Sequence, residues 1–154
     1  MYLYRREYVG GWDWKSAATD KDERPMYDAI LEYMDAPRCE GSPHAYIEVC
    51  VAYWRKANAV HKWFCNLDGG RDECQDIYVS YDKLRELRDL CESVIQQPAM
   101  ASNVLPTQPG FFFGSYDYDE WYMRDMENTV NQLDAVLASA GPDVWTDFIY
   151  RASW

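Results

Sequence analysis

The chain has 154 residues, and its 26 acidic and 15 basic residues give a formal net charge of −11. This charge argues against direct binding of nucleic acid, because such binding depends on neutralising phosphates with Lys and Arg. Its apolar content of 48% and aromatic content of 16% exclude wholesale disorder and predict one domain over residues 1–154. No apolar run approaches the length of a membrane span and the first residues lack the apolar core of a secretion signal, so we expect a cytoplasmic protein without a membrane partner.

The N-terminal half of the chain predicts one strand and two helices. Residues 1–9 alternate apolar and charged side chains as a strand does, and Gly10 with Gly11 ends it. Pro25 is suited to open a short helix that stops before Pro37. Residues 43–66 predict the central helix, because apolar side chains recur at helical spacing: Ile47, Cys50, Trp54, Ala57, His61 and Phe64.

The C-terminal half predicts two further helices and a closing strand. Ser80 is a plausible N-cap for a helix that Pro98 stops, and residues 98–116 form a long irregular connection. The last helix begins near Ser115 or Asp117 and ends at Gly141, and the pattern over 147–154 is that of a strand. We therefore predict an α+β fold: a mainly helical single domain of about four helices, with a small sheet formed by the N- and C-terminal strands.

A cationic and aromatic strip on the predicted central helix is the first candidate site. Residues 43–66 contain a single carboxylate, whereas residues 117–134 contain six. The strip could bind a small anionic ligand through cations, a stacking ring and two polar groups: Trp54, Arg55, Asn58, His61 and Lys62. The alternative is that Asn58 and His61 hydrogen-bond to the backbone of residues 98–116 and only fix its position, as buried polar groups normally do.

A second candidate surface precedes the last helix. Tyr116, Tyr118 and Trp121 would make a protein-binding edge if exposed, because aromatic residues anchor interfaces. Phe111, Phe112 and Phe113 predict a packed lid over the central helix. The carboxylates nearby argue against a phosphate loop at this helix start.

Metal binding and catalysis are the remaining site hypotheses. His61, Cys65 and Cys74, with Cys91 or His44, could ligate a metal, but their spacing matches no zinc pattern, so we favour core cysteines and expect no metal and no cofactor. His61 could act as an acid–base group with Asp119 or Glu120 in a hydrolase or transferase. The sequence contains no catalytic motif, so we name no catalytic residue and do not expect an enzyme.

An ordered run of motifs covers the middle and C-terminal parts of the chain: residues 53–65 and 78–80, then Leu84, Leu87 and Cys91, then residues 105–107, 110–115 and 118–120. This run resembles a family of small bacteriophage-encoded proteins. The resemblance implies a phage origin and a host-cytoplasmic location, and it supplies no catalytic residues.

Together, the resemblance and the acidic, aromatic surface predict an accessory protein that acts on a host process or host defence. It would inhibit by binding a host or phage protein rather than nucleic acid, with an acidic mimic of DNA as one form. The alternatives are sequestration of a nucleotide-like signal in a pocket on the central helix, and the uncharacterised hydrolase or transferase using His61. The sequence indicates no oligomeric state.

Overall fold

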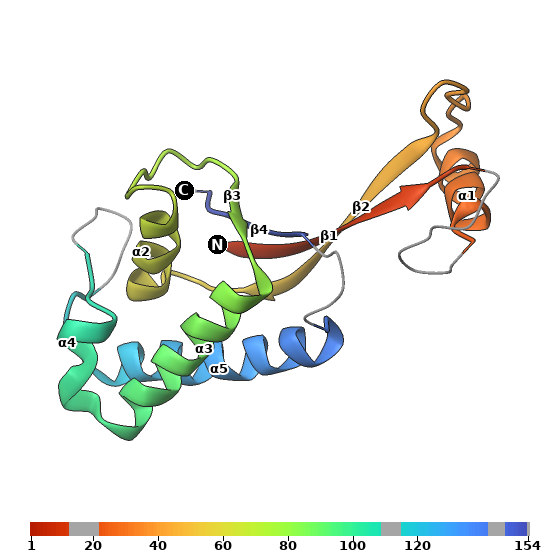
Figure 1. Ribbon diagram of the computed structural model, residues 1–154. Helices are drawn as coiled ribbons and strands as arrows, with labels where there is room; N and C mark the ends of the chain where they lie inside the picture. The colour runs from red at the N-terminus through yellow and green to blue at the C-terminus, as the bar shows by residue number, and fades with distance from the viewer. Residues whose placement is uncertain (13–21, 109–114, 142–146, 154) are drawn as a thin grey trace. The chain divides into compact units, whose positions relative to one another are not determined.

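The computed structural model describes residues 1–12, 22–108, 115–141 and 147–153. Within them lie four strands: β1 (Tyr2–Gly10), β2 (His44–Tyr53), β3 (Ile77–Val79) and β4 (Asp147–Arg151). The same residues form five α-helices: α1 (Arg24–Met34), α2 (Asn58–Leu67), α3 (Tyr81–Gln96), α4 (Ala101–Val104) and α5 (Glu120–Ser139). A short 3₁₀ turn, Pro98–Met100, precedes α4 (Figure 1).

The strands form one sheet in the order β2-β1-β4-β3. β3 is antiparallel to β4, with Ile77 opposite Tyr150 and Val79 opposite Phe148. The predicted fold class was therefore wrong. Helices account for only 48% of the structure, and the sheet contains β2 and β3 in addition to the strands near the two termini.

The largest error concerns the predicted central helix, because residues 44–53 form strand β2 and the helix α2 begins only at Asn58. This stretch is rich in β-branched and aromatic residues, which favour a strand with side chains on both faces. Cross-strand contacts with β1 hold it: Arg6 pairs with Glu48, and the rings of Tyr2 and Tyr53 lie 5.2 Å apart.

Other boundaries follow the sequence more closely. Pro25 lies in the first turn of α1, and the Ser80 hydroxyl accepts a hydrogen bond from the Lys83 amide as the N-cap of α3. The helix α5 begins at Glu120, later than predicted, because the carboxylate of Asp119 caps it.

The chain divides into two compact units. The smaller unit comprises residues 6–48 and carries α1 on the paired ends of β1 and β2. Its buried centre is Tyr27, and a Cβ atom on Gly11 would lie 2.3 Å from the Tyr27 ring, so this position requires glycine. Arg38 donates to the Gly11 carbonyl oxygen and its guanidinium lies over the Tyr27 ring.

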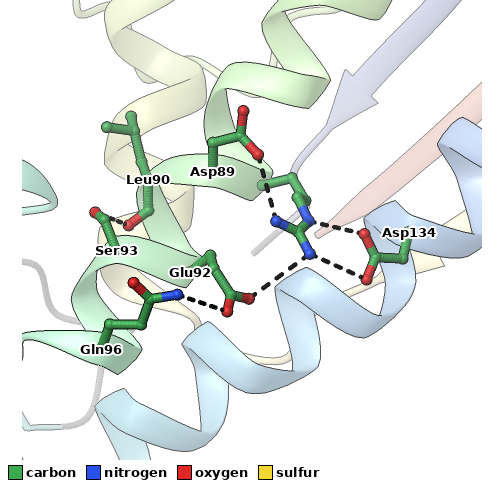
Figure 2. A network of polar contacts seen from close by, with 7 residues as sticks. Asp89, Leu90, Glu92, Ser93, Gln96 and Asp134 are labelled. Carbon is green, nitrogen blue, oxygen red and sulfur yellow. Dashed lines mark hydrogen bonds and ion pairs between the residues drawn. The ribbon is translucent and has the colours of Figure 1, made fainter.

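The larger unit comprises residues 1–5 and 49–154 and contains the hydrophobic core. Helices α3 and α5 pack against one another there, with Leu84, Leu87 and Leu133 fully buried. At the edge of this contact the Arg88 guanidinium lies 2.8 Å from Asp134 of α5 and also faces Asp89 and Glu92 (Figure 2). These groups are partly exposed, so the network contributes about 1 kcal/mol or less, and apolar burial is the main stabilising contribution.

Candidate functional site

A pocket of about 560 Å³ lies in the larger unit, between the start of α2 and the start of α5. This volume is within the range of small-molecule sites. Its lining is unusually rich in charge: Arg55 and Lys56 come from the connection before α2, and Asp117, Asp119 and Asp125 come from the α5 side. The ring of Trp121 also lines it.

Paired hydrogen bonds fix the walls of this pocket. The Asn58 side-chain amide donates to the Gln108 carbonyl oxygen at 2.7 Å, and its oxygen accepts from the Gln108 amide at 2.7 Å. The Tyr122 hydroxyl donates to the carbonyl oxygen of Leu105 at 2.9 Å. The segment 105–108 is therefore held to both α2 and α5, which places the two helix starts on either side of the pocket.

Arg55 and Lys56 supply the positive charge of the pocket. Both are exposed, and in the part of the chain that the structure describes neither side chain forms a hydrogen bond or ion pair. Lys56 has a φ of 60°, a left-handed conformation that L residues other than glycine seldom adopt. Such conformations cost free energy and recur at functional sites, so the outlier supports a role for this turn.

The opposite wall is acidic. The Asp119 carboxylate accepts hydrogen bonds from the Trp121 and Tyr122 amides, so part of its charge is neutralised at the helix start. Burial and, secondarily, the Asp119 charge raise the pKa of Asp125 to about 6. The pocket can thus bind a cationic group against its carboxylates and an anionic group against Arg55 and Lys56.

The predicted aromatic edge lies beside this pocket. Tyr116, Tyr118 and Trp121 are all exposed, and Trp121 has an exposed fraction of 69%. The Arg124 guanidinium lies 5.1 Å from the Trp121 ring centroid, and the Tyr118 ring packs edge-on against Tyr122. The prediction about Phe111, Phe112 and Phe113 falls outside the described residues.

The remaining predicted residues are not on one helical face. Trp54 precedes α2 and is buried, donating from its indole nitrogen to the Thr129 hydroxyl at 2.9 Å. Lys62 donates to the Thr107 carbonyl oxygen at 3.2 Å. The structure therefore brings together Arg55, Asn58 and Trp121 in the pocket. The alternative prediction of a structural hydrogen bond to residues 98–116 holds for Asn58.

His61 belongs to a different cluster. Its ring is 1% exposed, with Nδ1 2.6 Å from the Tyr150 hydroxyl oxygen and Nε2 3.1 Å from an Asp72 carboxylate oxygen. The Cys65 sulfur lies 3.3 Å from the same Nε2 atom. His61 therefore lies beside neither Asp119 nor Glu120, the carboxylates that an acid–base role was expected to use.

This cluster does not have the layout of a nucleophilic triad. In such triads the nucleophile and the orienting carboxylate occupy opposite nitrogens of the histidine, whereas here both face Nε2. Burial also raises the pKa of the Cys65 thiol to about 11, which disfavours the thiolate a nucleophile needs. Burial lowers the pKa of His61, and the hydrogen bond to Asp72 opposes that shift.

Sequence reasoning missed three residues of these sites. Lys56 was not named as a site residue, because the sequence predicted one continuous helix where the structure has the junction of a strand and a helix. Asp125 and Asp72 gave no usable signal, because each is one of many carboxylates in an acidic chain. Their proximity to the sites depends on how α5 and the loop after α2 are packed.

Comparison with protein-family models, with curated proteins and with solved structures finds no match to this chain. The resemblance to phage proteins is therefore still a prediction. Across the described ranges, the helices are all too short or too polar to cross a bilayer.

Proposed function

We propose that the protein works by binding, and that the pocket with its aromatic edge binds a basic segment of a partner protein. The observation that carries the proposal is the exposed Trp121 at the rim of a pocket containing Asp117, Asp119 and Asp125. A few residues carry most of the binding energy of a protein interface, and tryptophan and tyrosine are enriched among them. Carboxylates beside them select lysine and arginine on the partner.

The size of the pocket suits this role. A volume of about 560 Å³ accommodates one or two long side chains of a docked peptide segment. Arg55 and Lys56 on the facing wall would pair with a carboxylate of the same segment, so the pocket favours a partner whose charges alternate. The excess of negative charge on the chain would speed encounter with a basic partner.

The biological setting of the proposal comes from the resemblance alone. A phage-encoded protein in the host cytoplasm would use this surface to alter a host process or to block a host defence. Proteins that bind nucleic acid carry basic segments, so an acidic mimic of DNA is one form that this inhibition would take.

The test compares partner capture by four forms of the full chain in lysate of a candidate host. Wild type is run beside Trp121→Ala, Asp117→Lys and the control Glu127→Lys, an exposed carboxylate of α5 that does not line the pocket. We expect one protein to be retained by wild type and Glu127→Lys, lost with the other two, and released by added salt. Retention by all four forms, or no specific retention by wild type, overturns the proposal.

A second candidate function is sequestration of a small anionic ligand such as a nucleotide. The specific observation in its favour is that Arg55 and Lys56 line the pocket without a partner among the described residues, close to a stacking ring. Nucleoside mono-, di- and triphosphates are the probes, with thermal stabilisation as the measurement. Arg55→Ala and Lys56→Ala should abolish that stabilisation, whereas they should only weaken capture of a protein partner, which depends chiefly on Trp121 and the carboxylates.

A further inference from the structure

Three donor atoms of different residues converge on one point in the larger unit, away from the pocket. The Nε2 atom of His61, the sulfur of Cys65 and a carboxylate oxygen of Asp72 all lie within 4.8 Å of one another. His61 and Cys65 are one turn apart on α2, and Asp72 comes from the loop that follows it. None of the three lines the pocket described above.

Both distances from the histidine nitrogen are close to what a tetrahedral zinc ion requires. Zinc bonds of about 2.05 Å to nitrogen, 2.1 Å to oxygen and 2.3 Å to sulfur place nitrogen and sulfur about 3.6 Å apart, and nitrogen and oxygen about 3.4 Å apart. The structure has 3.3 Å between His61 Nε2 and the Cys65 sulfur, and 3.1 Å between Nε2 and the Asp72 oxygen. The three donor atoms would need to move apart by only a few tenths of an ångström to coordinate the ion.

The other histidine nitrogen is held as it is in metal sites. Metal-ligating histidines commonly donate their second ring N–H to an oxygen, which fixes the ring orientation and the tautomer. His61 Nδ1 lies 2.6 Å from the Tyr150 hydroxyl oxygen, and Tyr150 is itself buried in β4 against the Phe64 ring. With the proton on Nδ1, the lone pair of Nε2 is directed toward Cys65 and Asp72.

The loop that carries Asp72 folds back toward α2 through three residues in the left-handed backbone conformation. Gly69, Gly70 and Cys74 have φ values of 69°, 82° and 57°, and the Gly70 amide donates to the Cys65 carbonyl oxygen. Within the loop, the Gln75 side-chain amide donates to the Asp68 carboxylate and to the Arg71 carbonyl oxygen. The left-handed conformation of Cys74, which costs free energy, is thus part of the turn that places the Asp72 carboxylate beside His61.

From this geometry we propose that His61, Cys65 and Asp72 bind a zinc ion. The side chain of Asp72 is 37% exposed, so the site has a solvent-facing side through which the ion can enter. Water would complete the shell on that side. Nitrogen, thiolate and carboxylate together are ligands that zinc accepts, and hard ions such as Mg²⁺ avoid the thiolate.

The experiment titrates the reduced, metal-free full chain with Zn²⁺ against a chromophoric chelator, and separately with Co²⁺ as an absorbing substitute. The variants are Asp72→Asn in the exposed loop and the nearly isosteric Cys65→Ser. The matched controls are Glu73→Gln, the neighbouring carboxylate, and Cys39→Ser, an exposed thiol of the smaller unit. Circular dichroism verifies that each form is folded.

We expect wild type and both controls to bind one equivalent of Zn²⁺ and to give the Co²⁺ charge-transfer band of a thiolate ligand. Asp72→Asn should weaken binding at least tenfold, and Cys65→Ser should remove the charge-transfer band. If the folded wild-type chain binds no stoichiometric Zn²⁺, or if Asp72→Asn and Cys65→Ser bind like wild type, the cluster is only a hydrogen-bonded group and the proposal is overturned.

Discussion

At the scale of single residues, Asp125 is a carboxylate whose charged form the fold disfavours. Its pKa is raised from 3.8 to about 6, first by burial and then by the Asp119 charge. The folded state therefore binds the proton of the Asp125 carboxyl group more tightly than the unfolded state does. The stability that the protonated carboxyl group contributes is present below pH 4 and lost as pH rises through 6.

Asp125→Asn should raise the free energy of unfolding at pH 7 and reduce the fall in that free energy between about pH 4 and 6. Urea unfolding across that range measures it, with Glu127→Gln as an exposed control that keeps the wild-type profile. A profile for Asp125→Asn that runs parallel to wild type would contradict the assignment.

Lys56 stores backbone strain that a matched pair of variants can reveal. Lys56→Gly and Lys56→Ala both remove the ammonium group, but only glycine adopts a φ of 60° without steric cost. We expect the glycine variant to be more stable than the alanine variant by about 1 kcal/mol, measured by urea unfolding. Arg55 is not among the residues with positive φ, so the order should reverse there: Arg55→Gly should be less stable than Arg55→Ala. A glycine variant at position 56 that is less stable than its alanine counterpart would show that the turn relaxes in solution.

At the scale of secondary structure, the sequence predicted the helix starts marked by Ser80 and Pro25 and failed at the junction of β2 and α2. The hydroxyl of Ser80 and the proline at position 25 act locally, so their roles are visible in the sequence. Residues 44–53 are apolar at both helical and strand spacing, and pairing with β1 decides between the two. Arg55 was named as a candidate from the sequence and lines the pocket, whereas Asp72 could not be predicted, because only the folded loop brings it to His61.

The connection between α2 and the segment 105–108 depends chiefly on one amide. Asn58 is 6% exposed and exchanges two hydrogen bonds with the Gln108 backbone. Asn58→Ala should lower the free energy of unfolding by about 2–3 kcal/mol, because both backbone groups of Gln108 lose their partners. Faster hydrogen exchange at the Gln108 amide would localise the effect. Asn66→Ala, an exposed position of the same helix, should cost nothing and serves as the control. An equal loss in both variants would mean that the amide pair contributes no specific stabilisation.

At the scale of the whole molecule, the two compact units differ in what they contain. Every residue of the hydrophobic core cluster lies outside residues 6–48, and so do the described pocket residues and the aromatic edge. The smaller unit has its own buried tyrosine and exposes several apolar side chains, among them Tyr33 and Met34 of α1. The larger unit therefore has the means to fold and to bind without the smaller one.

A shortened chain tests this independence. The Trp54 amide donates to the Met1 carbonyl oxygen and the Gly11 amide to that of Pro43, so β1 and β2 run antiparallel and Arg5 lies roughly opposite Val49. Replacing residues 6–48 with a two-residue Asn-Gly turn would join the strands by the tightest favoured hairpin. We expect this chain to keep near-ultraviolet circular dichroism, to unfold cooperatively, and to retain any ligand or zinc binding of the full chain. Residues 6–48 alone are too few to bury an adequate core, so that fragment should be unfolded. If the shortened chain lacks a cooperative transition, the two units fold as one, and the apolar surface of residues 6–48 is part of what stabilises the larger unit.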